Sequence, residues 1–216
     1  MSNSVEGIAA GARGSVFVVS APSGAGKTTL CRRLIAELDG IDFSVSFTTR
    51  ATRAGEREGT DYHFVSRESF EKRIAAGEFI EWAVVDGQHY GTSAGAIREA
   101  SEGGRDILLD LDTQGAENIR RTIPDAILIF ILPPGRDALR ERLGKRGTEV
   151  AEDVERRLAL AADEVRKSPL YDFIVLNDDF ETAYGELRSI VVADRCRHIR
   201  RARRVREVVR GFDEML

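Results

Sequence analysis

Residues 21–29 read Ala-Pro-Ser-Gly-Ala-Gly-Lys-Thr-Thr, and they lie between the apolar run Val16–Val19 and an amphipathic stretch. This order predicts a buried strand, a glycine-rich loop and a helix over about residues 28–38. Small loop residues let backbone N–H groups approach phosphates, and the helix N-terminus adds its positive dipole end. In the pattern G-x-x-x-x-G-K-[ST], the lysine contacts the β- and γ-phosphates and the hydroxyl contacts Mg²⁺. Lys27 and Thr28 therefore predict a nucleoside triphosphate site with Mg²⁺ as cofactor; the alternative is a surface turn that matches by chance.

The first glycine of that pattern is replaced by Ala21. Pro22 follows it, and a residue before proline favours extended backbone angles, which alanine adopts without strain. The replacement therefore weakens the match only slightly.

The composition indicates one medium-sized domain, with or without insertions. The chain has 216 residues, of which 42% are hydrophobic and 31% charged, and its net charge of −4 does not favour general nucleic-acid binding. No stretch has the apolar length of a signal peptide or a membrane span, so we expect a soluble, cytoplasmic protein. Cys31 and Cys196 show no metal-binding spacing with the three histidines, and we expect both to be buried free thiols.

Short apolar runs alternate with helical patterns after the first strand. The runs are Ile107–Leu111, Ala126–Leu132 and Phe173–Leu176, and Phe180 to Val191 repeats apolar residues at helical spacing. Interleaving of this kind is typical of an α/β fold with a parallel sheet covered on both faces.

Two stretches lack this alternation of apolar runs and helical patterns. Ser44–Thr49, Asp61–Val65 and Glu81–Val85 mix aromatic, β-branched and polar residues, which predicts a small antiparallel insertion. Residues 135–157 are charged and rich in arginine. The expected organisation is a flexible leader (1–14), a core (15–42, 93–134 and 158–194), the first insertion (43–92), the second insertion (135–157) and a basic helical tail (195–216).

A run of motifs in fixed order resembles the guanylate kinase family of P-loop nucleoside monophosphate kinases. The motifs include Ser44–Glu56, Gly59–Val65, Phe79–Ala83, Leu109–Gly115 and Val175–Asp179, and the resemblance spans about residues 15–192. It implies a three-layer α/β/α fold that transfers a phosphoryl group from MgATP to GMP. The first insertion would then bind GMP, and the second would be a lid.

The resemblance assigns the GMP site to residues whose chemistry suits it. Guanine presents N1–H and N2–H₂ donors beside an O6 acceptor, so a carboxylate and a hydroxyl recognise it. Glu81 would supply the carboxylate and Ser46 the hydroxyl, while Arg50 and Arg53 would bind the phosphate. The full expected set is Ser46, Arg50, Arg53, Tyr62, Glu81, Tyr90, Thr92, Asp110 and Asp112.

The ATP site and the catalytic cations follow from the same resemblance. Phosphoryl transfer needs cations around the moving group, which spreads negative charge over its oxygens. The expected catalytic residues are Lys27, Arg50 and the lid arginines Arg142, Arg146 and Arg157. The expected ATP-binding residues are Ala21, Pro22, Ser23, Gly24, Ala25, Gly26, Lys27, Thr28, Thr29 and Asn177. Arg140 and Arg156 are expected to face solvent.

Two residues depart from the family pattern. Phe47 replaces a small hydroxyl residue, and we expect it to narrow the nucleobase pocket; Thr113 replaces an apolar residue. Two alternatives stay open: a related kinase acting on another phosphorylated acceptor, such as a ribose phosphate, and an interaction module without catalysis. The guanine-reading pair Glu81 and Ser46 disfavours the first, and the intact phosphate loop disfavours the second.

The tail lies outside the resemblance. Residues 195–210 hold eight arginines, with Ile199, Val205, Val208 and Val209 between them. The simpler interpretation is a helical extension with solvated or paired arginines. The alternative is an arm that binds nucleic acid or a partner. The sequence does not determine the oligomeric state.

Overall fold

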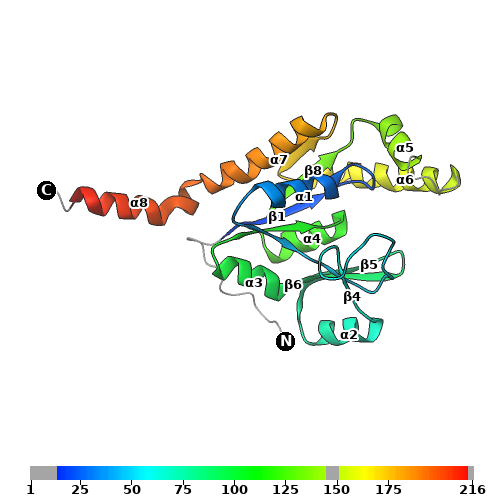
Figure 1. Ribbon diagram of the computed structural model, residues 1–216, viewed down its shortest axis with the longest axis horizontal. Helices are drawn as coiled ribbons and strands as arrows, with labels where there is room; N and C mark the ends of the chain where they lie inside the picture. Colours follow the sequence, from blue (N-terminus) through cyan, green and yellow to red (C-terminus); the bar gives the residue numbers. More distant parts are fainter. Residues whose placement is uncertain (1–13, 145–150, 214–216) are drawn as a thin grey trace.

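The computed structural model describes residues 14–144 and 151–213. Its core is a five-stranded parallel sheet with the strand order β2-β7-β1-β8-β9 (Figure 1). The strands are β1 (Val16–Ser20), β2 (Ile41–Ser44), β7 (Asp106–Asp110), β8 (Ile127–Leu132) and β9 (Phe173–Leu176). The predicted parallel sheet is confirmed, with β1, β7, β8 and β9 within one residue of the predicted runs.

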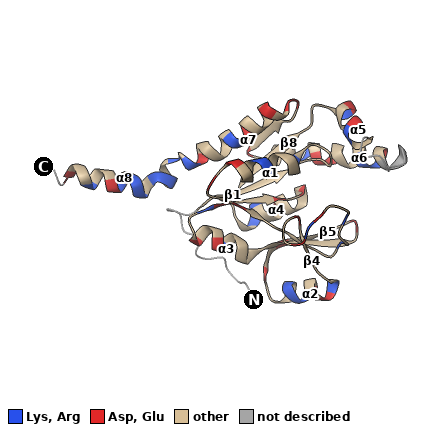
Figure 2. Cartoon of the chain, in the orientation of Figure 1, with Lys and Arg blue, Asp and Glu red and all other residues tan. Residues whose placement is uncertain are grey.

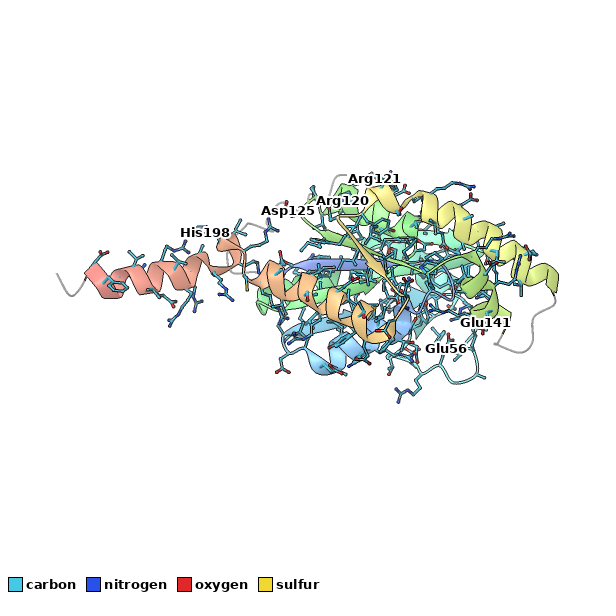
Figure 3. All side chains as sticks on the ribbon, turned by 90° about the horizontal axis from the view of Figure 1, so that it is seen from above. Glu56, Arg120, Arg121, Asp125, Glu141 and His198 are labelled. Carbon is cyan, nitrogen blue, oxygen red and sulfur yellow. The ribbon has the colours of Figure 1, made fainter. Side chains whose placement is uncertain are left out.

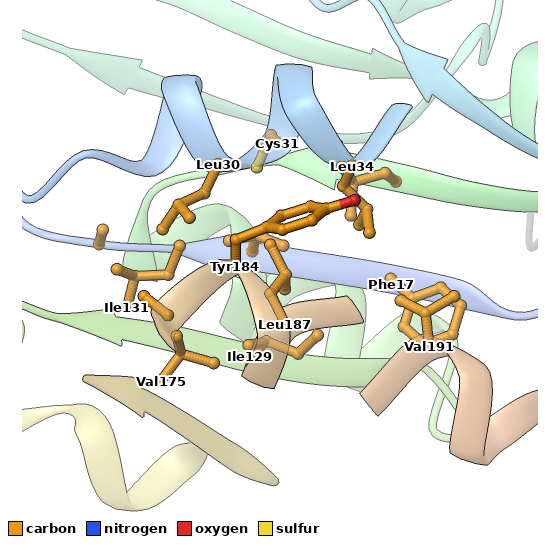
Figure 4. Close-up of a cluster of buried hydrophobic side chains, with 14 of the residues drawn as sticks. Phe17, Leu30, Cys31, Leu34, Ile129, Ile131, Val175, Tyr184, Leu187 and Val191 are labelled. Carbon is orange, nitrogen blue, oxygen red and sulfur yellow. The ribbon is translucent and has the colours of Figure 1, made fainter. Parts of the chain in front are cut away.

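Helices cover both faces of this sheet, because side chains of a strand alternate between its two faces. Phe17 and Val19 pack against α1 (Lys27–Glu37) and α7 (Phe180–Arg195), whose Leu34 and Leu187 are fully buried (Figure 4). Val16 and Val18 face the opposite layer, where α3 (Ala94–Glu102) and α4 (Thr113–Thr122) pack. The result is the expected three-layer α/β/α arrangement.

Strand β2 was not predicted. Only its end residues, Ile41 and Ser44, are buried, because β2 lies at the edge of the sheet and pairs with β7 alone. The expected start of the first insertion, at residue 43, falls inside this strand.

The insertion contains a second sheet of four strands in the order β4-β3-β6-β5. They are β3 (Phe47–Thr48), β4 (His63–Phe64), β5 (Phe79–Val85) and β6 (Gln88–Ser93), and α2 (Arg67–Ala75) packs beside them. The prediction of an antiparallel sheet needs correction, because β3 and β4 run parallel. The other two pairs are antiparallel, and the β5–β6 hairpin turns at Asp86 and Gly87, both with positive φ.

The second insertion is helical. Helix α5 (Arg136–Gly144) and helix α6 (Ala151–Arg166) pack through Leu139, Leu143, Leu158 and Ala161. The expected boundary at residue 157 lies inside α6, and the short 3₁₀ helix η1 (Ser168–Leu170) leads from α6 to β9. Within the described ranges, no helix combines the length and apolar composition needed to cross a bilayer.

The described part of the chain ends in α8 (His198–Asp213), which projects away from the body (Figures 1 and 3). Between α7 and α8 lies Cys196. Cys31 is buried as predicted, but Cys196 is exposed, because it caps the end of α7 at the surface. The leader predicted over residues 1–14 lies almost wholly outside the described residues, which begin at Gly14.

Candidate nucleotide site

The phosphate loop joins the carboxyl end of β1 to α1, where open α/β sheets bind ligands. Gly24 and Gly26 have φ of 88° and 94°, a region that favours glycine, and Gly26 is the N-cap of α1. The Ala25 N–H donates to the Pro22 carbonyl at 3.0 Å. Ala21 is not among the described residues with positive φ, as expected from its position before Pro22.

Lys27 lies at the base of this loop and is held by the end of β7. Its Nζ is 2.6 Å from Asp110 Oδ1 and donates to the Leu111 carbonyl at 2.8 Å. Burial opposes the charged form of Lys27, but the neighbouring Asp110 carboxylate outweighs it and raises the pKa of the ammonium. Lys27 is therefore a fixed cation beside the loop.

A cleft of about 680 Å³ lies between α1 and the first insertion. Its lining includes groups predicted from far-apart parts of the sequence: Thr28, Ser46, Arg50, Arg53, Tyr62, Tyr90 and Asp110. The exposed hydroxyl of Thr28 and the Asp110 carboxylate are hard oxygen donors, which suit Mg²⁺. Within the described residues, no group of three or more His, Cys, Asp or Glu residues is placed to hold a metal.

Arg50 enters the cleft but is paired with an acid. Its Nη2 donates to Glu56 Oε1 at 2.8 Å and its Nη1 donates to Glu56 Oε2 at 3.0 Å, while its Cζ lies 5.3 Å from the Tyr62 ring centre. The hydrogen bonds from Arg50 lower the pKa of Glu56. The sequence alone indicates no role for Glu56, although it follows the two arginines in the motif. Arg53 is exposed, and its backbone N–H donates to Glu56 Oε2 at 2.8 Å.

A smaller cavity of about 200 Å³ adjoins the cleft, and Lys27 lies at its wall. It brings together six of the nine predicted GMP residues: Ser46, Tyr62, Glu81, Tyr90, Asp110 and Asp112. Gly115 also lines it and was not predicted; a Cβ there would lie 3.4 Å from Glu81 Oε2. The small size of Gly115 leaves room beside that carboxylate.

Glu81 is a buried acid, and no lysine or arginine of the described residues hydrogen-bonds to its carboxylate. Thr92 Oγ1 donates to Glu81 Oε1 at 2.6 Å, so Thr92 orients the carboxylate. Burial raises the pKa of Glu81, and the nearby Asp112 acts in the same direction. Asp112 is partly engaged as the N-cap of α4, since its Oδ1 accepts from the Gly115 N–H at 2.7 Å. The second Glu81 oxygen faces the space beside Gly115.

The lid arginines differ in position. Arg142 donates to the Asn177 carbonyl at 3.1 Å, and Arg157 donates to Ser23 Oγ in the phosphate loop. Arg140 and Arg156 are exposed, as predicted, and Arg140 pairs with Glu155 at 2.7 Å. Arg146 lies outside the described residues.

Asn177 is buried against the phosphate loop. Its Nδ2 donates to the Ala25 carbonyl at 2.6 Å, and a Cβ on Gly26 would overlap this amide. In this arrangement the side chain supports the loop. Contact with adenine, which the resemblance implied, stays a prediction.

Phe47 lines neither the cleft nor the smaller cavity. Its ring packs against His63 and Phe79, at centroid distances of 4.6 and 5.5 Å, and Arg73 lies over it. The expectation that Phe47 narrows the nucleobase pocket is therefore not supported by its position: Ser46, just before β3, lines both the cleft and the cavity, whereas Phe47, the first residue of β3, lines neither. Thr113 lines a separate pocket between α4 and η1.

A parallel α/β sheet, a glycine-rich loop at the end of β1 and an adjoining cationic cleft define the class of P-loop kinases. A sequence model of the guanylate kinase family matches residues 13–194. Guanylate kinases of Symbiobacterium thermophilum and Thiobacillus denitrificans are 49% and 51% identical to the chain, over 87% and 82% of its length and 89% and 85% of theirs. The crystal structure of guanylate kinase from Anaplasma phagocytophilum superposes with a TM-score of 0.74 at 33% identity, covering 89% of this chain and 92% of that one. The chain belongs to the guanylate kinase family.

Proposed function

We infer that this protein transfers the γ-phosphoryl group of ATP to GMP, giving ADP and GDP, as its family membership indicates. The observation that carries the assignment to particular residues is the juxtaposition of the Lys27 ammonium and the Glu81 carboxylate around one cavity. One end of that cavity suits a phosphate, and the other suits a guanine edge.

We propose that Glu81 and Ser46 read the base. Glu81 would accept hydrogen bonds from N1–H and N2–H₂, and Ser46 would donate to O6. Thr92 would hold the carboxylate, and Asp112 would complete the nucleoside contacts. Adenine lacks the N1–H and N2–H₂ donors, so it would offer this buried carboxylate no hydrogen bond.

The GMP phosphate would bind in the wider cleft. Arg50 is aimed there, and Tyr62 and Tyr90 flank it, with their rings 6.0 Å apart. The GMP phosphate would replace the Glu56 carboxylate as the partner of the Arg50 guanidinium, because both anions can accept two hydrogen bonds from it. Arg53 would add a second, more exposed cation.

The triphosphate would occupy the loop of residues 21–29, with its tip beside Lys27. Lys27 would stabilise the charge that develops on the transferred group, and Asp110 would orient Lys27. Mg²⁺, when bound with the nucleotide and held in part by Thr28, supplies further neutralisation of phosphate charge.

Residues 43–92 would form the GMP-binding part and residues 135–157 the lid. Arg142 and Arg157 already contact Asn177 and Ser23 at the phosphate loop, so a modest movement of α5 and α6 would bring both over the triphosphate. Arg146 is proposed as the third lid cation from the resemblance alone.

An acceptor profile tests the proposal. ADP formation is measured with GMP, AMP, CMP, UMP and a ribose phosphate as acceptors, at saturating ATP with and without Mg²⁺. We expect turnover with GMP that needs Mg²⁺. Preference for a ribose phosphate would contradict the assignment of Glu81, and no turnover with any acceptor would contradict the function.

A further inference from the structure

The Glu81 carboxylate is held from two sides, and one of the two groups that hold it lies outside the predicted site. Thr92 Oγ1, on β6, donates to Glu81 Oε1 at 2.6 Å. The second group is the side-chain amide of Asn118, on α4. Its hydrogen bond to Glu81 favours the charged carboxylate and so opposes the rise in pKa that burial causes. The sequence alone indicates no role for Asn118.

The packing of α4 against β5 brings Asn118 to this carboxylate. Gly115 and Asn118 lie on the same face of α4, because residues three apart are neighbours on a helix surface. A Cβ on Gly115 would be 3.4 Å from Glu81 Oε2, so this face of the helix meets the carboxylate directly. Asn118 is half-buried and does not line the cavity, so it reaches Glu81 without entering the space proposed for GMP.

A neighbouring arginine determines which way the Asn118 amide faces. The last turn of α4 is basic (Figure 2). There Arg121, which is exposed at the surface (Figure 3), donates through Nη2 to Asn118 Oδ1. A guanidinium can only donate hydrogen bonds, so the amide oxygen faces Arg121 and the NH₂ group is left for another acceptor. That acceptor is the Glu81 carboxylate.

The hydrogen-bonding capacity of the carboxylate matches this arrangement. An ionised carboxylate has about four acceptor positions, two on each oxygen. Thr92 and Asn118 use two of them, and the two that remain equal the number of donors, N1–H and N2–H₂, on the guanine edge. A carboxylate held at one point only could rotate about its last side-chain bond, which is a soft torsion. Two holding groups remove that freedom before the base binds.

We propose that Asn118 is a positioning residue for guanine selection: together with Thr92, it holds Glu81 so that the free acceptor positions of the carboxylate face the base. Asn118 acts through Glu81 and does not itself touch GMP. The inference rests on the proposed function, in which GMP is the phosphoryl acceptor. It extends the base-reading part of the site from the insertion to the middle of α4.

Asn118→Leu tests this role, because leucine has a similar shape and no donor. The KM for GMP is expected to rise roughly tenfold, since a hydrogen bond to a charged group is lost, while kcat and the KM for ATP stay within about twofold. Asn118→Asp also places a second negative charge beside Glu81 and should raise the KM for GMP further. Thr122→Val is the matched control. The Thr122 hydroxyl donates to the Asn118 backbone carbonyl at 3.0 Å, so this variant alters the same turn of α4 and should keep the KM for GMP.

A double variant separates the positioning of Glu81 from general damage to α4. In a Glu81→Gln background, Asn118→Leu should change the KM for GMP by less than about twofold, because the carboxylate on which Asn118 acts is absent. Losses that add in the double variant would show that Asn118 does not act through Glu81.

The pH profile gives a readout that a merely structural role of Asn118 would not move. Loss of the amide donor raises the pKa of Glu81, so in Asn118→Leu the acid-side rise in the KM for GMP should begin at a higher pH than in the unmodified chain. Arg121, behind Asn118, stays in place in both chains. So do the titratable groups that line the cavity with Glu81, which are Lys27, Tyr62, Tyr90, Asp110 and Asp112.

Thermal unfolding and the KM for ATP show whether each variant folds, and Asn118→Asp carries the same test if Asn118→Leu does not. A KM for GMP equal to that of the unmodified chain, or an unmoved pH profile, would overturn the role of Asn118. If the unmodified chain still uses GMP in that case, the proposed function stands without it. If GMP is not the acceptor of the unmodified chain, the proposed function and the role of Asn118 fail together.

Discussion

At the scale of single residues, the charged groups of the proposed site are held in place by neighbouring protein groups. The Lys27 ammonium is fixed by Asp110 and the Leu111 carbonyl, and the Glu81 carboxylate is fixed by Thr92. Preorganised groups lose little freedom when substrate binds, so their interactions act mainly on the reaction.

Lys27→Ala is expected to lower kcat by about 10²- to 10⁴-fold while GMP binding is retained, because the substitution removes a cation at the transferred group. Steady-state kinetics measure kcat, and calorimetry measures GMP affinity. Near-normal turnover would show that Lys27 does not stabilise the transition state.

The raised pKa of Glu81 determines the direction in which the KM for GMP is expected to change with pH. Burial raises the pKa of Glu81 above its ordinary value of 4.5, so protonation begins at a higher pH than for an exposed glutamate. In the proposed site the carboxylate form would read guanine; hence the KM for GMP is expected to rise as pH falls through this raised pKa, while the KM for ATP changes little.

Glu81→Gln should remove this acid-side dependence of the KM for GMP. It should also weaken GMP binding roughly 10- to 100-fold at neutral pH, since a charged acceptor is lost. Measurement of both KM values from pH 5 to 8 tests the pair of predictions. Unchanged discrimination between GMP and AMP in the variant would exclude Glu81 from base recognition.

At the scale of elements, the phosphate loop is supported from β9. Asn177 follows that strand and donates to the Ala25 carbonyl, while Arg142 of α5 donates to the Asn177 carbonyl. The phosphate loop, β9 and α5 therefore meet at Asn177.

Gly26→Ala is expected to reduce ATP-dependent turnover by at least about tenfold. A side chain at φ 94° is strained and would overlap the Asn177 amide, which displaces the loop. The matched control is Gly77→Ala, at φ 67° with open space around it, which should affect stability but not the KM for ATP.

Phe47→Ser addresses the inner packing of the insertion. The ring contacts His63 and Phe79 rather than the cavity, so the variant should lose roughly 1–2 kcal/mol of stability. The KM for GMP should change less than tenfold. Thermal unfolding and kinetics separate the two effects. A larger change in the KM for GMP would indicate that the Phe47 ring contacts the guanine base.

At the scale of the whole molecule, ion pairs connect the arginines of the tail to the core sheet. Asp106 is 1% exposed and receives two arginines from the α7–α8 junction. Removing one side of a buried ion pair leaves the other unpaired, which costs more than the pair contributes.

Asp106→Asn is expected to lower the free energy of unfolding by about 2–4 kcal/mol, with kcat for GMP unchanged. Urea unfolding measures this effect. Asp42→Asn serves as the control because its pair with Arg105 is at the surface, and a loss below about 1 kcal/mol is expected. Equal losses in both variants would show that the network is not structural.

Local pattern was sufficient to determine the parallel core strands, the phosphate loop and the helix after it, because apolar periodicity and glycine spacing are local signals. Motifs in fixed order identified the family. The same local signals missed β2, whose short, half-polar run marks a sheet edge, and misplaced Phe47, whose side depends on the register of β3.

Only the tertiary structure shows that Glu56 pairs with Arg50, that Asn177 donates a hydrogen bond to the phosphate loop, and that Asp106 pairs with the tail arginines. These partners are 6, 152 and about 90 residues apart in the chain. The separate residue types were visible in the sequence. Which of them pair depends on chain folding, because ion pairs and hydrogen bonds act over a few ångströms and carry no signal in sequence spacing.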